Sequence, residues 1–149
     1  MYIAYTDGSY LRADNSCGFG IYLYDSEHPE NYTEIYGREL RSDHLAMWNV
    51  GGEIAAVEYL LDYCIENHIT KIRIFHDYNG LGHWARGTWK RNKPATIAYA
   101  NKIKMLESVI SMEFYHVKGH SGNKYNARAD QLANLGRHAE KVEVIKHGN

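Results

Sequence analysis

The order of strand-like and helix-like segments limits the folds open to this chain. The first three segments are rich in β-branched and aromatic residues, as strands are, and lie at residues 2–6, 18–24 and 32–37. Helical and strand patterns then alternate, with helices at 54–64, near 79–86, at 95–110 and at 126–137, and strands at 71–75 and 112–117. The order βββαβαβα predicts the α/β class, with a five-stranded mixed sheet and helices on both faces.

Helical crossovers make the first, fourth and fifth predicted strands parallel, whereas short connections make the second and third antiparallel. We expect residues 1–137 to form one domain. The remaining residues, 138–149, form a tail that contains Val142, Val144 and Ile145. Two alternatives stay open for this tail, a docked short strand and a frayed end.

Length and composition exclude several classes of protein. The 149 residues fit one domain, and the two cysteines are too few for a disulfide framework or a thiolate metal site. No apolar run is long enough for a membrane span, and the first residues show no secretory signal. We therefore expect a cytoplasmic protein without a membrane partner, and the near-even charge favours a monomer.

Four acidic residues are expected to meet at one edge of the sheet. Parallel strands bring their carboxyl ends to one edge, where ligands usually bind, and Asp7 and Asp77 each end a predicted strand. Glu53 and Asp130 fall in the first turns of predicted helices. Such a group of carboxylates would repel strongly without cations, and hard oxygen ligands favour Mg²⁺ or Mn²⁺ over zinc.

Each of the four acids also has an ordinary structural explanation. Asp7 before Gly8 is typical of a turn, and Asp77 is placed to cap the helix that follows. Glu53 and Asp130 are placed to interact with helix dipoles. The metal-site hypothesis depends on the combination, because four independent coincidences at one edge are improbable.

The motifs around these acids resemble the type 1 ribonuclease H family, in order and across residues 1–137. The matching segments are Tyr5-Thr6-Asp7-Gly8-Ser9, Gly18-Phe19-Gly20, Asn49-Val50-Gly51-Gly52-Glu53, Ile74-Phe75-His76-Asp77, His116-Val117-Lys118-Gly119-His120-Ser121-Gly122 and Asn126-Ala127-Arg128-Ala129-Asp130. The resemblance implies the ribonuclease H-like fold and an endonuclease that hydrolyses the RNA strand of RNA–DNA hybrids, leaving 5′-phosphate and 3′-hydroxyl ends.

The resemblance also implies a set of site residues. Asp7, Glu53, Asp77 and Asp130 would hold two Mg²⁺ ions, with Mn²⁺ as a substitute, and Asp7 would bridge the pair. Two such ions activate water and neutralise the attacking and leaving oxygens. His120 would assist proton transfer or product departure, although a loop histidine is more often simply solvated.

Recognition of RNA requires contact with the 2′-hydroxyl. The matching positions are Ser9, Tyr10 and Asn49, with Asn126 as a further amide. Val50 stands where many family members carry a second amide, and the loop after Ser9 lacks the usual Asn-Pro-Gly.

A basic, aromatic segment follows the fourth predicted strand. Between Tyr78 and Leu106 there are six basic residues and no acidic one, which leaves 11 basic against 18 acidic residues elsewhere. Lysine and arginine interleaved with aromatic residues are typical of surfaces that follow phosphates. The resemblance to the family implies that this segment holds the DNA strand, through Trp89, Lys90, Arg91 and Lys93. The alternative is a solvated helix face with tryptophans in the core.

Three rival functions remain. One is an inactive hybrid-binding module, although all four carboxylates are present. The second is a DNA-acting nuclease of the same superfamily, such as an integrase or resolvase, in which the Lys-Gly-His loop is not expected. The third is the nuclease domain of a reverse transcriptase. A strand that begins one residue after Met1 favours a free-standing protein instead.

Overall fold

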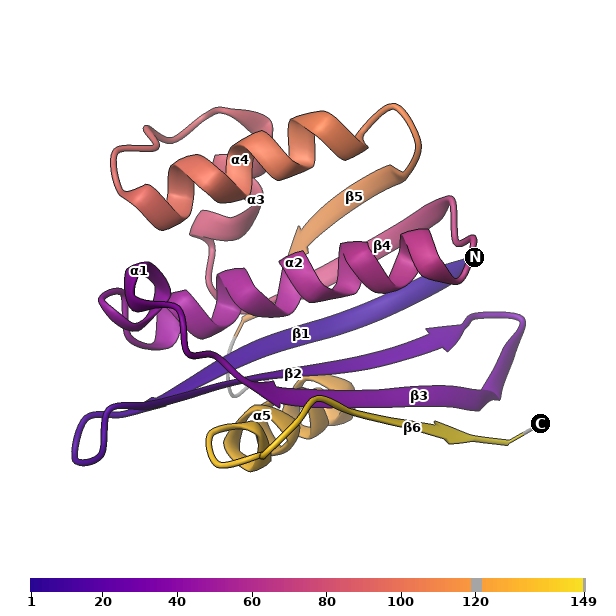
Figure 1. The fold of residues 1–149 in the computed structure, drawn as a ribbon. Helices are drawn as coiled ribbons and strands as arrows, with labels where there is room; N and C mark the ends of the chain where they lie inside the picture. The colour runs from indigo at the N-terminus through magenta and orange to yellow at the C-terminus, as the bar shows by residue number, and fades with distance from the viewer. Residues whose placement is uncertain (119–121, 149) are drawn as a thin grey trace.

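Six strands form one mixed sheet in the computed structural model, which describes residues 1–118 and 122–148 (Figure 1). They are β1 (Tyr2–Leu11), β2 (Ser16–Asp25), β3 (His28–Arg38), β4 (Lys71–His76), β5 (Ser111–His116) and β6 (Glu143–His147), in the order β5-β4-β1-β2-β3-β6. As predicted, β1, β4 and β5 run parallel and β2 and β3 antiparallel.

The sheet has one strand more than the predicted five. Part of the C-terminal tail forms β6, which pairs antiparallel with the outer edge of β3 from Tyr36↔Glu143 to Tyr32↔His147. Of the two alternatives for the tail, the structure shows the docked strand. Its pairing covers backbone groups that would otherwise form an open sheet edge.

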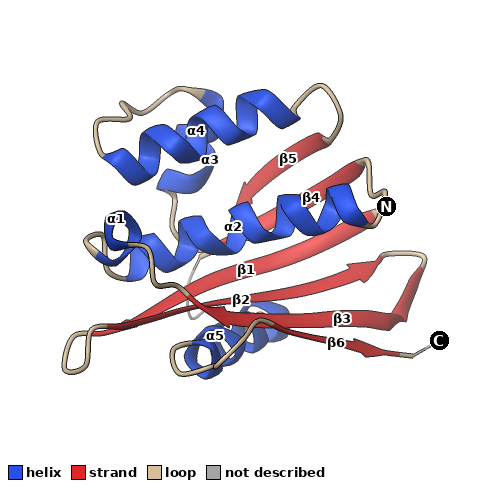
Figure 2. Ribbon diagram, in the orientation of Figure 1, coloured by secondary structure: helices blue, strands red, loops and turns tan. Residues whose placement is uncertain are grey.

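The helices lie on both faces of the sheet, as expected (Figure 2). They are α1 (Ser42–Leu45), α2 (Asn49–Glu66), α3 (Gly80–Arg86), α4 (Pro94–Leu106) and α5 (Lys124–Gly136). Helix α2 lies across β1 and β2 on one face, α3 and α4 lie on the same side toward β5, and α5 packs on β1, β2 and β3 from the opposite side. Among the described helices, none has both the length and the apolar character that crossing a membrane requires.

Alternation along β2 explains how one strand packs against two layers. Phe19 and Ile21 are buried in the core with α2, and the Phe19 ring stacks on Tyr59 of that helix. Gly18 and Gly20 point the other way, where an added Cβ would lie 2.3–2.4 Å from backbone atoms of α5. The glycines therefore let α5 lie directly on the backbone of the sheet.

The predicted end of the first strand is wrong, and this error bears on the site. The pair Asp7-Gly8 was expected to end the first strand, but β1 continues through both residues because they pair with β2. The parallel pairing of β1 with β4 does stop there, since its last pair joins Thr6 to His76. Asp7 and Asp77 therefore both lie one residue beyond the last parallel pair.

Candidate functional site

Three carboxylates from distant parts of the chain meet at this edge of the sheet. Asp7 comes from β1, Glu53 from α2 and Asp77 from the turn after β4, and one oxygen of each lies within 4.8 Å of the other two. Asp7 and Glu53 are only 4% and 3% exposed. The structure thus brings together three of the four predicted acids.

Glycines allow α2 to lie close to both β1 and α1, and this close packing brings the three carboxylates together. A Cβ on Gly8 would lie 2.2 Å from the backbone nitrogen of Glu53, so only glycine fits between the strand and the helix. A Cβ on Gly51 would lie 1.8 Å from the carbonyl oxygen of His44 in α1. Gly8 is therefore a packing residue inside a strand, which explains why its interpretation as a turn residue is wrong.

Two histidines fix the turn that carries Asp77. The Nε2 group of His116 donates to the carbonyl oxygen of Asp77, and the Nδ1 group of His76 donates to that of Tyr78, each at 2.9 Å. Burial lowers the pKa of His76 to about 4, so its ring is neutral at neutral pH. The turn is held by these hydrogen bonds, which leave the Asp77 side chain available to the site.

Asp130 lines the same pocket as the other three acids but lies outside their 4.8 Å group. Helix α5 begins at Lys124, two residues earlier than predicted, because the Asn123 side chain accepts hydrogen bonds from the backbone N–H groups of Tyr125 and Asn126. Neither Asp130 nor Glu53 therefore lies in a first helical turn. Interaction with a helix dipole does not explain either acid.

Two of the three clustered carboxylates have strongly shifted pKa values. Burial raises the pKa of Asp7 to about 7, and the charges of Asp77 and Asp130 act in the same direction. Burial, followed by the closeness of Asp7 and Asp77, raises the pKa of Glu53 well above its ordinary value. Within residues 1–118 and 122–148, no basic side chain forms an ion pair with any of the three.

The cluster fits a hard divalent cation. The Oε2 atom of Glu53 is buried without a hydrogen-bond partner among the described residues, and the available ligand atoms are all carboxylate oxygens. Mg²⁺ and Mn²⁺ prefer such ligands. A bound cation would favour the charged carboxylates and so oppose both the burial and the repulsion that raise these pKa values.

The acids lie in an open pocket of about 620 Å³. Its other lining residues are Gly8, Ser9, Asn49, Val50, Tyr78, Gly122, Asn123, Asn126 and Ala127. Three predicted substrate contacts are therefore at the pocket. Asn49 is exposed, whereas Asn126 is buried with its Oδ1 atom unpartnered among the described residues.

Two of the predicted contacts also have internal roles. The Ser9 hydroxyl donates to Oδ1 of Asn134 at 2.5 Å, which ties β1 to α5. The backbone N–H of Tyr10 donates to Oδ1 of Asn49 at 2.8 Å, so the amide of Asn49 is left with its Nδ2 group as a donor. Asn123 was missed from the sequence, although an asparagine just before a helix is a recognisable cap signal.

The basic segment is divided between the core and the surface. Trp84 is buried, as the structural alternative required, whereas Trp89 is 39% exposed and stacks on the His83 ring with 4.6 Å between centroids. Arg91 donates through Nε to the carbonyl oxygen of Trp84. The exposed residues Lys90 and Lys93 form no ion pair with another described residue.

His120 lies outside the described residues, so its predicted role stays a prediction. The neighbouring described residues Lys118 and Gly122 border the segment on either side. Gly122 lines the pocket and has a φ of +83°, which favours glycine.

Comparison with known proteins gives one consistent result. Residues 1–138 match the protein family described as RNase H. A curated ribonuclease H from Syntrophomonas wolfei is 31% identical over 143 residues, covering 88% of this chain and 92% of that protein.

Solved structures give the same fold. RNase H1 from the halophilic archaeon Halobacterium salinarum NRC-1 aligns with a TM-score of 0.74 at 21% identity, covering 91% of this chain and 96% of that one. LC11-RNase H1, solved in complex with an RNA/DNA hybrid, aligns with a TM-score of 0.73 at 20% identity, covering 92% and 96%. These matches agree with the resemblance predicted from the sequence.

Proposed function

This chain belongs to the RNase H family, and from that premise we propose that it hydrolyses the RNA strand of RNA–DNA hybrids. The observation that carries the proposal is the group of three carboxylates, two of them buried, that form no ion pair with a basic side chain of the described residues and lie in an open pocket beside exposed polar groups. A relative of the same fold was solved with an RNA/DNA hybrid bound, which supports the substrate class. We place the catalytic unit within residues 1–137, with β6 as an appended strand.

Two Mg²⁺ ions, or Mn²⁺ in their place, would be held by Asp7, Glu53, Asp77 and Asp130. When bound, such ions activate water and stabilise the leaving oxygen, giving 5′-phosphate and 3′-hydroxyl ends. The chain's own contribution is to hold the carboxylates in a fixed group before the substrate arrives, since β1, α2 and the turn after β4 are each anchored by close packing or hydrogen bonds. His120 is assigned to proton transfer or product departure.

Substrate would be recognised on both sides of this group. The Nδ2 group of Asn49, the backbone of Ser9 and Tyr10, and Asn126 would contact ribose in the minor groove. Lys90 and Lys93, with Trp89 and Arg91, would follow the phosphates of the DNA strand. A monomeric state and a cytoplasmic location complete the proposal.

One cleavage assay tests the proposal. Labelled RNA–DNA hybrid, duplex DNA and duplex RNA are incubated with the protein in Mg²⁺ or in EDTA, alongside an Asp7→Asn variant. We expect cleavage only of the RNA strand of the hybrid, only with Mg²⁺, and not by the variant. Cleavage of duplex DNA would favour the DNA-acting alternative, binding without cleavage would favour the inactive module, and cleavage in EDTA would contradict the metal site.

A further inference from the structure

Trp48 has an unusual backbone conformation beside the pocket. Its φ is +58° and its ψ is −128°, and it directly precedes the first residue of α2. The other non-glycine residues with positive φ among those described are Asn15 and His68, types that tolerate this region better than a bulky side chain. Strained backbone of this kind persists only where the surroundings hold it, and it is concentrated at functional sites.

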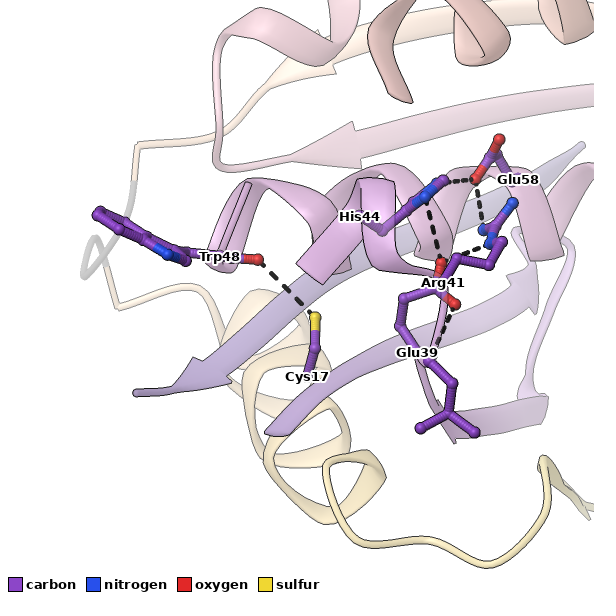
Figure 3. Close-up of polar contacts among 7 residues, drawn as sticks. Cys17, Glu39, Arg41, His44, Trp48 and Glu58 are labelled. Atoms are coloured by element: carbon purple, nitrogen blue, oxygen red, sulfur yellow. Dashed lines mark hydrogen bonds and ion pairs between the residues drawn. The ribbon is translucent and has the colours of Figure 1, made fainter. Parts of the chain in front are cut away.

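Neighbouring residues hold the backbone of Trp48 in this conformation from both sides. The carbonyl oxygen of Trp48 accepts hydrogen bonds from the backbone N–H of Gly51 at 3.1 Å and from the thiol of Cys17 at 3.8 Å. Ahead of it, α1 is fastened to α2 by the buried contact between His44 and Glu58 at 2.8 Å (Figure 3). The conformation is therefore imposed by contacts of the backbone and of neighbouring residues.

The indole ring takes no part in this anchoring. Figure 3 shows the ring projecting away from the polar contacts that hold the segment, and Trp48 is 58% exposed. Its described ring contact is with Tyr10, at 6.5 Å between centroids and an angle of 22°. Tyr10 in turn donates its backbone N–H to Asn49, which lines the pocket. The strained residue thus holds an exposed ring next to Asn49, a lining residue of the pocket, and this ring buries little surface in the free protein.

We propose that Trp48 is a substrate-contacting residue whose exposed ring packs on sugar faces in the minor groove of the bound hybrid, next to Asn49. This inference rests on the proposed function and adds a contact to it. An aromatic ring offers sugars and bases an apolar face that does not depend on sequence. Contacts with both Trp48 and Asn49 would hold the RNA strand in register with the carboxylate cluster that contains Asp7. The fold accepts a strained backbone at position 48 because the ring acts on the ligand.

The test is a Trp48→Gly variant, since glycine adopts this backbone conformation without strain. We expect unchanged or higher thermal stability, a KM for hybrid raised about tenfold, and a kcat within about twofold of the parent. Trp48→Tyr should recover most of the affinity. His68→Gly is the matched control because His68 has a φ of +55° at the far end of α2, and it should leave KM unchanged.

A binding measurement separates this inference from the proposed function. Hybrid is added to an Asp7→Asn protein, which should not cleave it, and which also carries Trp89→Phe because Trp89 is itself assigned to the DNA strand. The hybrid is expected to change tryptophan emission, and a further Trp48→Phe substitution should remove most of that change. If the parent protein cleaves hybrid but Trp48→Gly leaves KM unchanged, or if the emission change survives Trp48→Phe, the inference is overturned. Failure of the parent protein to cleave hybrid would instead overturn the proposed function.

Discussion

Two acidic residues on helix α2 have the same burial and opposite electrostatic environments. Glu53 and Glu58 lie five positions apart and are 3% and 6% exposed. Glu53 faces Asp7 and Asp77, and its pKa is raised well above the ordinary value. Burial would raise the pKa of Glu58 as well, but the hydrogen bond from His44 and the charge of Arg41 hold that pKa below its ordinary value.

The difference lies in where the positive charge comes from. Glu58 accepts hydrogen bonds at 2.8 Å from both His44 and Arg41, and Arg41 also contacts Glu39 at 2.6 Å, so Glu58 has a positively charged partner within the fold (Figure 3). The cluster around Glu53 has no such partner among the described residues. A buried acid with an internal cation fastens two elements together, whereas a buried acid without one marks a site that needs a cation from solution.

The largest effect is expected from Glu53→Gln. Removing one metal-binding carboxylate should reduce the rate of hybrid cleavage by about a thousandfold or more, because the bound charge that stabilises the transition state would be misplaced. The same change removes repulsion from Asp7 and Asp77, so the metal-free variant should unfold at a higher urea concentration than the parent. Equal activity of variant and parent would contradict the metal site.

Glu58→Gln is the matched control on the same helix, and it should lower stability while leaving the rate of cleavage nearly unchanged. Loss of the negative charge leaves His44 and Arg41 without their shared partner, which we expect to lower the free energy of unfolding by about 2 kcal/mol. The value is below that for fully buried pairs because the Arg41 side chain is 54% exposed. At a temperature where the variant is folded, its kcat should be within about twofold of the parent, as urea unfolding and cleavage assays would show.

The stability of the metal-free protein should depend on pH in opposite directions for the cluster around Glu53 and the cluster around Glu58. The pKa of Asp7 is raised from 3.8 to about 7, so the folded state holds a proton that the unfolded state has released. Its contribution to stability is present below about pH 4 and is lost as the pH rises to about 7, by at most about 1.4 kcal/mol per pH unit. Glu58 acts in the other direction, since its stabilising contribution is present above its ordinary pKa of 4.5 and is lost at lower pH.

Urea unfolding in EDTA at pH 5 and pH 7, for the parent and for Asp7→Asn, measures the Asp7 contribution. The parent should lose more stability than the variant over this interval. Added Mg²⁺ should stabilise the parent more at pH 7 than at pH 5, because the ion competes with the proton. A parent and a variant with the same pH dependence would contradict the raised pKa of Asp7.

The smallest effect is expected from basic residues. Like the two glutamates, they include residues with an ion-pair partner and residues without one among those described. Lys90→Ala with Lys93→Ala should raise KM for hybrid several-fold and reduce the slope of log affinity against log salt by one to two, because up to two phosphate contacts are lost. Lys102 is paired with Asp62 at 2.7 Å, so Lys102→Ala is the control and should leave the slope unchanged. An unchanged slope in the double variant would reject this surface as the DNA-binding side.

The sequence predicted much of the fold because its signals are local. Alternation and helical spacing indicated the order of elements, and motif order indicated the family. The prediction failed where the deciding contact is distant in sequence. Gly8 next to Asp7 is typical of a turn, and only the approach of α2 shows that it lies within β1. The tail gave no decisive signal because β6 is stabilised by pairing with β3, more than 100 residues away.

The site shows the same division. The sequence by itself determined which residue types are available, namely the four acids, the amides Asn49 and Asn126, and a basic segment with tryptophans. Its motifs singled out Glu53, but it could not show that Glu58 is paired with His44 and Arg41, nor that Trp48 has a strained backbone and an exposed ring. Only the tertiary structure decided these points, because the charge state of a buried group and the exposure of a ring depend on which distant residues the fold places around them.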